Sequence, residues 1–362
     1  MSRAPEHTRQ ARVAIVIPHA GGTEILRACL EALESCRERT PLRLLLVDNL
    51  SPDDSVRLAA EHHPWIEVLT QTRNLGFAGG CNAGLAHACA QPGLEYAVLL
   101  NNDTVPEPGW LDALLQLADA HPGVAALQPR LLSLPNPGKL DYSGAAGGLL
   151  DRYGFPYALG RLFDHIESDG ANWLEPRLLA WTSGTACLLR LQALREVGLL
   201  DESFFMHMEE IDLCWRLRLK GWKLASCPGS RVHHHSGYSL KAGSPRKVYL
   251  NHRNSLLMLV KNLTPGALLA RLPLRLLLDG AACLQQLLSG RPASAWAVIH
   301  ALAGFVRRLP AARAEAKRLA GLTSRGPSCV KETEFPGSIV IQFWIKGHRG
   351  ADQLGWLPPL LK

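Results

Sequence analysis

The first 130 residues alternate between unbroken apolar runs and stretches with helical periodicity. The apolar runs predict strands buried on both faces, at Val13–Ile17, Leu44–Val47, Ile66–Leu69 and Tyr96–Leu100. The periodic stretches between them predict helices, of which the clearest are Thr23–Arg37 and Ala78–Ala90. Strands and helices that alternate at this spacing indicate an α/β fold with a mostly parallel sheet flanked by helices.

The pattern changes twice further along the chain. Residues 131–178 are rich in Gly, Pro and Tyr, which predicts an irregular segment that faces a substrate. Regular structure is then predicted at Gly184–Arg190, Leu191–Val197, Glu209–Leu219 and Lys223–Ser226. Long amphipathic helices follow Asn262, and the late run SIVIQFW resembles a strand. We therefore divide the chain into an α/β part, 1–262, and a helical C-terminal extension, 263–362.

Charge is distributed unevenly over the 362 residues, whose formal net charge is +7. Residues 263–362 hold 13 Lys and Arg against 5 Asp and Glu, whereas the first 262 hold 26 against 27. Because the excess is confined to one end, nucleic acid is not expected as a partner. Nine cysteines without a C-x-x-C pair indicate reduced thiols in the cytoplasm.

Membrane segments are not expected from the hydropathy of the chain. The first twelve residues lack the apolar stretch of a signal peptide, and Pro292–Val306 is shorter than the ~20 residues of a spanning helix. We therefore expect a cytoplasmic protein, with the inner face of the cytoplasmic membrane as a candidate peripheral site. Arg271, Arg275, Arg307 and other basic residues of the extension would then contact anionic headgroups.

Polar residues follow three of the predicted strands, at Pro18, Asp48 and Asn101–Asp103. Ligands bind at the carboxyl ends of strands in open α/β sheets, so these positions predict a site. Asp48 can accept a hydrogen bond from a ribose hydroxyl or a pyrimidine N–H. It can equally cap the following turn.

A glycine-rich segment, Asn74–Asn82, enters the helix after the third strand. Glycines at a helix N-terminus let backbone N–H groups approach a phosphate, which is one interpretation. The other is a tight connection that needs small residues for packing. The segment matches neither the dinucleotide fingerprint nor the P-loop motif.

Two separate features suit a metal ion. Asp103 ends the fourth strand, and a carboxylate oxygen there is a suitable ligand for a divalent cation. The tract His233–His235 can direct one imidazole towards the same ion. A capped turn at Asp103 and a solvent-facing tract are the alternatives.

Carboxylates also cluster at Glu209, Glu210 and Asp212, at the start of a predicted helix. The helix dipole explains part of this cluster, and Asp212 can pair with Arg216 four residues on. Glu209 and Glu210 point in directions about 100° apart around a helix, so at most one of them faces a given pocket.

Together these segments resemble glycosyltransferase family 2, and within it the rhamnosyltransferase-like bacterial branch. The matching phrases are VAIVIP, LLLVDNLSPDDS, RNLGFAGGCNAG, AVLLNNDT, TSGTACLLR, EVGLLDESFFMHMEEIDLCWRLRLKGW, RVHHHSGYS and HRNSLLMLVKN. The resemblance implies a nucleotide-diphospho-sugar transferase (GT-A) fold and an inverting transfer from a nucleotide-diphosphate sugar. It also implies a Mg²⁺ or Mn²⁺ cofactor and a glycan or lipid-linked acceptor in surface polysaccharide synthesis, with rhamnose as a candidate sugar.

The resemblance assigns roles to individual residues. Asp48 matches the nucleotide-binding Asp and Pro18 lies near the base, while Asn74, Gly76, Asn82 and Asn102 are expected to contact the donor. Asp103 matches the last acid of the D-x-D metal motif, His234 the downstream metal-side His, and Glu210 the general base. The chain departs from the family where D-x-D becomes Asn-Asn-Asp and where Glu replaces the usual catalytic Asp. These departures leave Glu209 and Asp212 as alternative bases.

Two other classes of function compete with a transferase. The eroded metal motif allows a nucleotide-sugar-binding protein with little catalysis, and the His tract allows a metal-dependent hydrolase, although H-E-x-x-H is absent. The helical extension can also pack on a second copy of the chain, so a homo-oligomer is a further candidate assembly.

Overall fold

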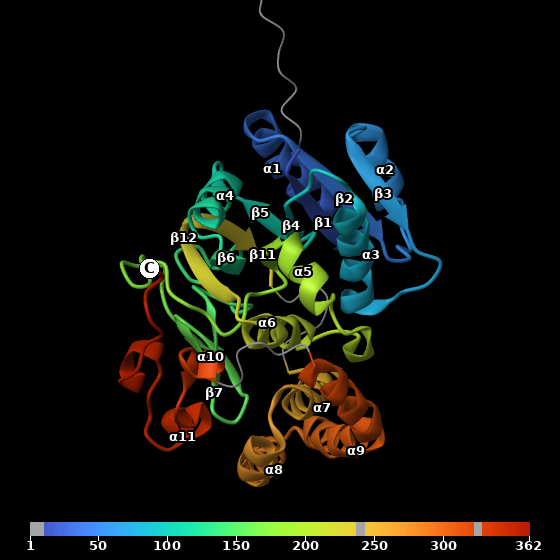
Figure 1. Cartoon of the computed structure of the whole chain (residues 1–362). Coiled ribbons are helices and arrows are strands. Elements are labelled where there is room, and N and C mark those ends of the chain that lie inside the picture. The colour runs from blue at the N-terminus through green and yellow to red at the C-terminus, as the bar shows by residue number, and fades with distance from the viewer. Residues whose placement is uncertain (1–10, 237–242, 322–327) are drawn as a thin grey trace, which may run out of the picture.

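A computed structural model describes residues 11–236, 243–321 and 328–362. Its centre is an eight-stranded sheet with the order β3-β2-β1-β4-β11-β6-β12-β5 (Figure 1). The strands are β1 (Val13–His19), β2 (Leu42–Asp48), β3 (Ile66–Thr70), β4 (Tyr96–Leu100), β5 (Thr104–Pro106), β6 (Val124–Ser133), β11 (Ala186–Arg190) and β12 (Lys223–His234). Pairing is parallel from β3 to β4 and between β6 and β12, whereas β11 and β5 run antiparallel to their neighbours. The predicted strands at the N-terminus are confirmed.

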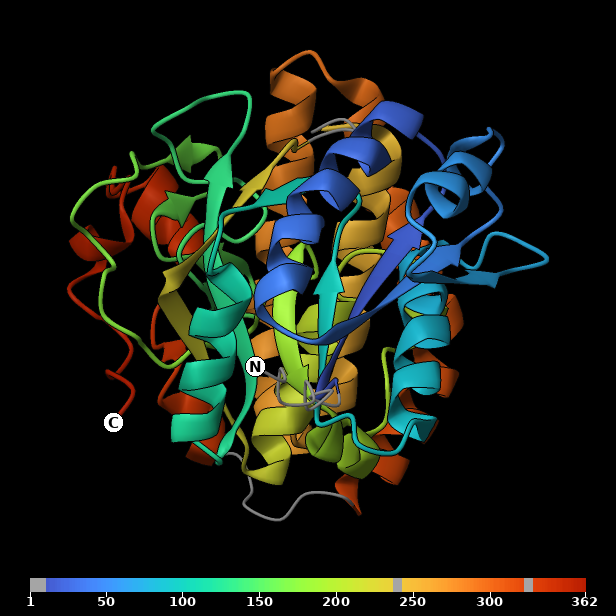
Figure 2. The ribbon, with the colours of Figure 1, turned by 90° about the horizontal axis from the view of Figure 1, so that it is seen from above.

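Helices cover both faces of this sheet, as the unbroken apolar runs predict. Val13, Ile15 and Ile17 of β1 pack in one core with α1 (Thr23–Arg39) and α4 (Trp110–Ala120). Ala14 and Val16 belong to the opposite core, with α3 (Gly76–Ala90), α5 (Leu191–Val197) and α6 (Glu209–Lys220). A short helix, α2 (Ser55–His62), connects β2 to β3. Figure 2 shows the sheet between these helical layers.

The segment predicted to be irregular, 131–178, consists mostly of turns and loops but also contains short strands. Its first residues end β6, and its short strands pair with β13 from the end of the chain in a five-stranded sheet with the order β10-β9-β8-β7-β13. Its strands are β7 (Gly148–Asp151), β8 (Pro156–Ala158), β9 (Arg161–Leu162), β10 (His165–Ile166) and β13 (Glu334–Phe335). The sequence analysis missed these strands, because strands of two to four residues are too short to show a period of two.

The chain after the main sheet is helical. Its helices are α7 (Pro245–Asn262), α8 (Pro265–Leu288), α9 (Pro292–Ala320), α10 (Ser328–Lys331) and α11 (Ile339–Trp344), with a 3-10 turn at Ala351–Leu354. An earlier 3-10 turn, Glu202–Phe204, precedes α6. The apolar run SIVIQFW forms α11 and not a strand, so that prediction is wrong. Ser338 caps this helix by accepting a hydrogen bond from the Ile341 N–H, and Ile339 and Phe343 are buried on one face.

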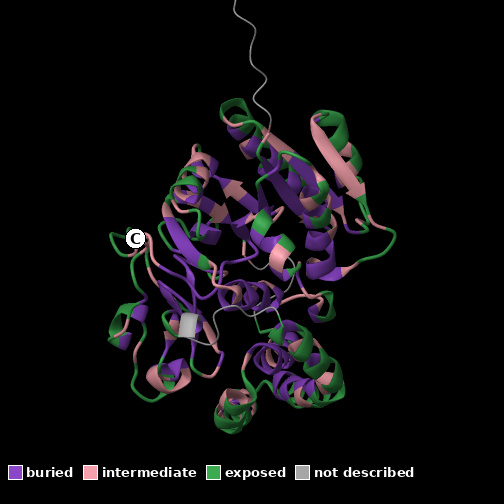
Figure 3. Ribbon diagram, viewed as in Figure 1, coloured by how far each residue is buried: buried purple, intermediate pink, exposed green. Residues whose placement is uncertain are grey.

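The helix α7 links the two parts of the chain. It packs against α9 and is the next helix after β12, so the extension predicted to start at residue 263 begins just after its last residue. Figure 3 shows the strands and α6 as largely buried, while α8 and the outer side of α9 carry many exposed positions. The division at residue 262 stays a prediction about separate folding units.

Candidate active site

A cavity of about 840 Å³ lies where the carboxyl ends of the central strands meet the C-terminal helices. Its wall includes Asn101 and Asp103 after β4, Glu209 and Glu210 of α6, and His234 at the end of β12. Residues of α7, α8 and α11 complete the opposite wall, among them Lys247, Arg275 and Trp344. The residues predicted for metal binding and for base catalysis therefore line one cavity.

Asp103 and His234 lie side by side in this cavity. Oδ1 of Asp103 is 3.2 Å from Nε2 of His234, and among the described residues this buried oxygen accepts no hydrogen bond. Nδ1 of His234 lies 2.9 Å from Oδ1 of Asp141, a residue that the sequence gave no reason to select. Burial lowers the pKa of His234, but the carboxylates of Asp103 and Asp141 outweigh it and raise the pKa to about 9.

The Asp103–His234 pair offers two side-chain ligands that suit a divalent cation. An imidazole nitrogen and a carboxylate oxygen suit Mn²⁺, and a carboxylate on the other ring nitrogen is the usual orienting partner of a ligating His. Oδ1 of Asp103 is buried and accepts no hydrogen bond among the described residues, which fits a cation as its partner. Within the described ranges no cluster of three or more His, Cys, Asp or Glu forms a complete metal site, so the described residues offer two protein ligands here.

Asn102 belongs to a hydrogen-bond chain that joins three strand-end loops. Its side-chain nitrogen lies 2.8 Å from Nδ1 of His19, and Nε2 of His19 lies 2.7 Å from Oγ of Ser55. The hydroxyl of Ser55 donates to Asp53, which also accepts from the Gly22 N–H at 2.7 Å. Burial lowers the pKa of His19, so the ring stays neutral and can bridge Asn102 and Ser55 through its two nitrogens. Asn102 therefore helps to fix the loop geometry around the predicted donor site.

The predicted nucleotide-binding positions lie together at the ends of β1 and β2. Oδ1 of Asp48 accepts from the Ser51 N–H at 2.9 Å, so one carboxylate oxygen caps the turn. Asn49, which the sequence analysis missed, accepts from the Leu75 N–H at 2.8 Å and donates to the Gly76 carbonyl at 2.9 Å. Asn74 in turn accepts from the Gly76 N–H at 2.9 Å. These bonds hold the glycine-rich segment against β2.

The glycines of this segment and of the helix that follows it allow close packing. Gly76 has φ 72°, and a Cβ there would lie 2.5 Å from Phe205. A Cβ at Gly80 would lie 3.2 Å from Nδ2 of Asn49, and one at Gly84, just after the segment, would lie 2.3 Å from Val16 of β1. These contacts fit the interpretation as a tight connection, and they place α3 directly on β1.

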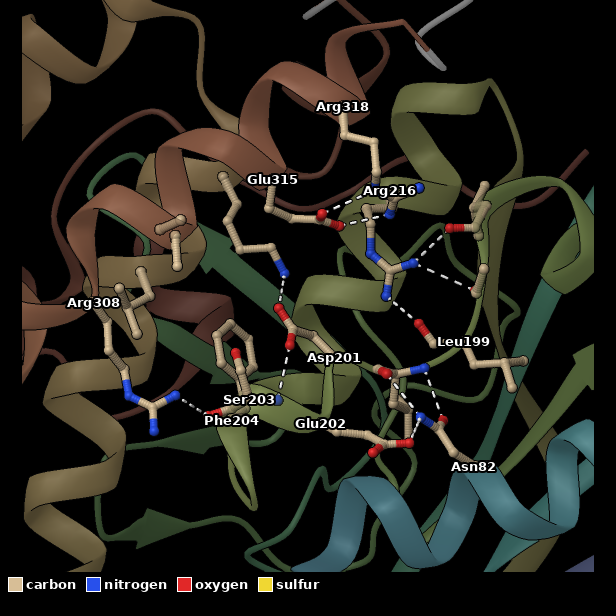
Figure 4. Close-up of a pocket in the computed structure, with 17 residues that line it drawn as sticks. Asn82, Leu199, Asp201, Glu202, Ser203, Phe204, Arg216, Arg308, Glu315 and Arg318 are labelled. Atoms are coloured by element: carbon tan, nitrogen blue, oxygen red, sulfur yellow. Dashed lines mark hydrogen bonds and ion pairs between the residues drawn. The ribbon is translucent and has the colours of Figure 1, made fainter.

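Asn82 faces away from the large cavity, towards a second cavity of about 450 Å³ (Figure 4). Its amide nitrogen donates to the Leu200 carbonyl at 2.9 Å and to Glu202 at 3.0 Å, and its oxygen accepts from the Leu200 N–H at 3.0 Å. Both polar atoms are thus engaged by the loop before α6. This arrangement makes Asn82 a structural residue and does not support its predicted contact with the donor.

Asp212 is held in a buried ion network. It contacts Lys261 at 2.9 Å, Arg216 at 3.0 Å and the Asn262 amide at 2.8 Å. Burial opposes ionisation, but the charges of Lys261 and Arg216 outweigh it and lower the pKa of Asp212. A carboxylate with both oxygens occupied by these partners is unsuited to accept a substrate proton.

Glu209 and Glu210 behave differently, because Oε2 of each is buried with no hydrogen-bond donor among the described residues. Burial raises the pKa of Glu210 to about 7, and burial together with the Glu210 charge raises the pKa of Glu209 well above its usual value. Glu209 is only 2% exposed, whereas Glu210 is partly open to the cavity. Glu210 thus combines access with a pKa near neutrality, which a general base needs.

The backbone that presents these two carboxyls is strained. Phe205, His207 and Met208 have φ values of 67°, 67° and 75°, a region that non-glycine residues rarely adopt. The side-chain nitrogen of Asn254 lies 3.1, 3.0 and 2.8 Å from the carbonyl oxygens of Phe204, Met206 and His207. Asn254, on α7, therefore fixes the turn from which α6 starts.

Comparisons with known proteins agree with this arrangement. Residues 11–248 match the family model described as glycosyltransferase like family 2. The chain is 30% identical over 257 residues to N-acetylglucosaminyl-diphospho-decaprenol L-rhamnosyltransferase of Mycobacterium tuberculosis, covering 68% of this chain and 82% of that protein. It is 29% identical over 229 residues to galactofuranosyltransferase GlfT1 of Mycolicibacterium smegmatis, covering 62% and 70%. The chain therefore belongs to glycosyltransferase family 2.

Solved structures show the same fold at low identity. The crystal structure of GalNAc-T7 with UDP, GalNAc and Mn²⁺ superimposes with a TM-score of 0.54 at 15% identity, covering 70% of this chain and 48% of that one. The crystal structure of S. aureus TarS 1-349 gives 0.53 at 14% identity, covering 86% and 83%. The predicted GT-A fold and the glycosyltransferase class are confirmed.

Proposed function

We propose that this protein is an inverting glycosyltransferase that moves a sugar from a nucleotide-diphosphate donor to a hydroxyl of a glycan or lipid-linked acceptor. One observation carries the proposal. The Asp103–His234 pair and the Glu210 carboxyl, which has a pKa of about 7, line the same cavity at the carboxyl edge of the sheet. Inverting transfer needs one base on the acceptor side and one charge-stabilising centre on the leaving-group side.

In this mechanism Glu210 accepts the proton of the acceptor hydroxyl. The acceptor oxygen attacks the anomeric carbon from the face opposite the diphosphate, so the new C–O bond forms as the bond to the diphosphate breaks. A single catalytic carboxylate suffices, unlike the pair that a glycosidase uses. Burial and the neighbouring Glu210 charge raise the pKa of Glu209 well above its usual value, which disfavours its ionised form, and Asp212 stays ion-paired.

Asp103 and His234 would hold a Mg²⁺ or Mn²⁺ ion through Oδ1 and Nε2. A divalent cation supplies charge that neutralises the departing nucleoside diphosphate. The Mn²⁺ in the GalNAc-T7 structure supports this choice of ion. Asp141 would orient the His234 ring, since it engages Nδ1.

The nucleotide would bind along the ends of β1 and β2. We propose that Pro18 contacts the base and that Asp48 contacts the ribose or base. Asn102 belongs to the loop that would lie beside the diphosphate. Asn74 and Gly76 would shape the same edge through their bonds with each other and with Asn49. Asn82 is left out of the donor site because Leu200 and Glu202 occupy its amide.

The relatives suggest which substrates to test first. The mycobacterial relative is named for transfer of L-rhamnose to a diphospho-decaprenol carrier, which supports rhamnose as the sugar and a lipid-linked diphosphate as the acceptor. A role in cell-wall or surface polysaccharide synthesis follows from such an acceptor.

We further propose that α8 lies on the cytoplasmic face of a membrane. No helix in the described ranges is long and apolar enough to cross a bilayer. The exposed positions of α8 are entirely apolar, and Leu269, Leu277 and Leu288 are 77%, 70% and 81% exposed. An apolar helix face of this kind suits burial in the interfacial region of a bilayer.

The expected role of Arg271 and Arg275 in this contact needs correction. Arg271 pairs with Glu334 at 2.6 Å, and Arg275 is buried and pairs with Asp279 at 3.1 Å. Both therefore point into the protein, and the basic contacts with anionic lipid would come from exposed residues of α9 such as Arg307, Arg313 and Lys317.

Vesicle flotation tests the membrane contact. Wild type should float with anionic vesicles, and the triple variant Leu269→Ser, Leu277→Ser, Leu288→Ser should stay at the bottom. Light scattering distinguishes the other candidate occupant, a second copy of the chain. If the wild type never floats and the triple variant converts a dimer to a monomer, α8 is a subunit interface and the membrane proposal is wrong.

A donor panel tests the transferase against its two rivals. Wild type is incubated with nucleotide sugars and Mn²⁺ or Mg²⁺, and slow donor hydrolysis is scored with and without a lipid-diphosphate acceptor. A transferase favours one donor and speeds up with acceptor, a nucleotide-sugar-binding protein releases no sugar, and a metal-dependent hydrolase is indifferent to the acceptor. Release that is absent for every donor would refute the proposal.

A further inference from the structure

The large cavity is lined by two cationic side chains that differ from their neighbours in how they are paired. Arg161 of β9 and Lys247 of α7 both line it, and neither forms an ion pair with a carboxylate in the described ranges. Most other buried or half-buried cations around the site, such as Arg216, Lys261 and Arg275, have carboxylate partners. The contrast singles out these two side chains.

Arg161 is the more deeply buried of the two, at 6% exposure. Its Nη1 donates to the Phe163 carbonyl at 3.1 Å, and its buried Nε has no acceptor within the described part of the chain. The neighbouring carboxylate, Asp141, is already engaged by His234, Ser236 and the Ser143 N–H. A buried guanidinium with an unused donor is costly unless a ligand supplies the acceptor.

The ring of Tyr142 brings the two cations together. The Arg161 guanidinium lies 4.7 Å and the Lys247 ammonium 5.3 Å from the centroid of this ring, which also lines the cavity. Stacking on an aromatic ring orients both charges without neutralising either of them. Both cations line the cavity that Asp103 and His234 also line, and the charge of Asp141, the partner of His234, acts on Arg161.

The ligand chemistry follows from the donors. A guanidinium fork and an ammonium facing one space match the several oxygens and the double charge of a diphosphate. We propose that Arg161, Lys247 and Tyr142 form a subsite for a diphosphate group. This inference rests on the proposed function, in which two substrates carry that group, the nucleotide donor and a lipid-linked acceptor.

Binding measurements with three probes test the subsite and distinguish the two sources. Inorganic pyrophosphate, a nucleoside diphosphate with Mn²⁺, and farnesyl diphosphate are titrated into wild type, Arg161→Met and Lys247→Met. Arg246→Met is the matched control, because Arg246 is exposed on the same helix and does not line the cavity. Pyrophosphate affinity should fall about tenfold or more in the first two variants and stay within about twofold in the control, as expected for lost charged hydrogen bonds.

The organic probes then assign the source. Loss of affinity for the nucleoside diphosphate alone places the donor there, and loss for farnesyl diphosphate alone places the acceptor there. Lys247 is only half-buried, so its variant keeps the test valid if Arg161→Met fails to fold. Unchanged pyrophosphate affinity in a folded Lys247→Met protein would overturn the subsite.

The subsite and the proposed function can fail independently of each other. If wild type transfers no sugar while both cation variants lose pyrophosphate, the proposed function fails and the subsite stands. If sugar is transferred but pyrophosphate binds equally to all variants, the subsite alone fails.

Discussion

Nε2 of His234 lies 3.2 Å from Oδ1 of Asp103, although the two residues are far apart in the chain. The pairing of β12 with β5 explains this proximity. His234 is in register with Thr104, the residue after Asp103, because the two strands run antiparallel at the edge of the sheet. A long β12 thus carries the His tract to the loop that ends β4.

This pair predicts how metal-dependent nucleotide binding responds to mutation. Asp103→Ala and His234→Ala should each abolish the gain in nucleotide affinity on adding Mn²⁺, while His233→Ala, whose ring pairs with Glu107, should retain it. Because the pKa of His234 is raised to about 9, a proton competes with the ion, so Mn²⁺ affinity should rise with pH up to that value. Calorimetric titration measures both effects, and an unaltered Mn²⁺ response in Asp103→Ala contradicts the assignment.

The same raised pKa affects stability in the absence of metal. A His whose pKa is higher in the folded state stabilises the fold fully below its unfolded pKa of about 6.5. This contribution is lost as the pH rises through about 9. Denaturant titration of wild type and His234→Ala should therefore show a difference at pH 6 that shrinks by pH 10.

Asp212 should prove structural and not catalytic. Asp212→Asn removes the charge that compensates Arg216 and Lys261, so the free energy of unfolding should fall by about 3 kcal/mol, as for broken buried ion pairs. The lowered pKa of Asp212 means that its stabilisation is present near neutral pH and is lost in acid, as the pH falls through the folded-state pKa. Folded enzyme should keep at least a tenth of its turnover. Full stability with no turnover would instead make Asp212 the base.

Asn254 should act by positioning Glu210. Replacing it with Leu removes the donor that holds the carbonyls of Phe204, Met206 and His207, so the left-handed turn should relax and displace the start of α6. We expect kcat to fall by about tenfold or more, with little change in the Kd of the nucleotide. Asn254→Asp cannot donate and should behave like Asn254→Leu, whereas Asn254→Gln should recover part of the rate. If all three variants kept the kcat of wild type, Asn254 would have no positioning role in catalysis.

Glu210 should set the pH profile of the reaction. With a pKa of about 7, the base is protonated in acid, so kcat should rise about tenfold per pH unit below that value and level off above it. The raised pKa also means that ionised Glu210 destabilises the fold as the pH rises above its unfolded value of about 4.5 and through 7. Glu210→Gln should therefore raise Tm more at pH 8 than at pH 5. A Tm difference that is independent of pH would show that Glu210 is not a buried, titrating carboxyl.

Strands of the main sheet such as β1, β2 and β4 could be predicted from the sequence because they are apolar on both faces, whereas β6 and the three-residue β5 were not predicted. The second sheet could not, since strands such as Arg161–Leu162 have too few residues to show a period. The run at Ile339–Trp344 is apolar throughout, and such a run does not distinguish a strand from a helix.

The candidate site also contains residues that the sequence indicates and residues that only the fold brings together. Asp103, His234 and Glu210 could be found because each belongs to a local motif. Asp141 and Asn254 act only through contacts across the fold, so no local pattern marks them. The helix α8 is amphipathic, as predicted. Its charged side chains face the protein and its leucines face outward, and periodicity alone does not show which side of a helix faces the protein.

The anomeric configuration of the released sugar tests the central claim most directly. Donor hydrolysis with Mn²⁺ is followed by NMR from the first minutes, with water as the acceptor, in wild type, Glu210→Gln and Glu209→Gln. We predict that wild type first forms the sugar with inverted configuration, and that Glu210→Gln forms it at least ~10²-fold more slowly while binding the donor normally. Glu209→Gln should remain within about tenfold of wild type. A first product of retained configuration, or full activity in Glu210→Gln, would contradict inverting transfer with Glu210 as the base.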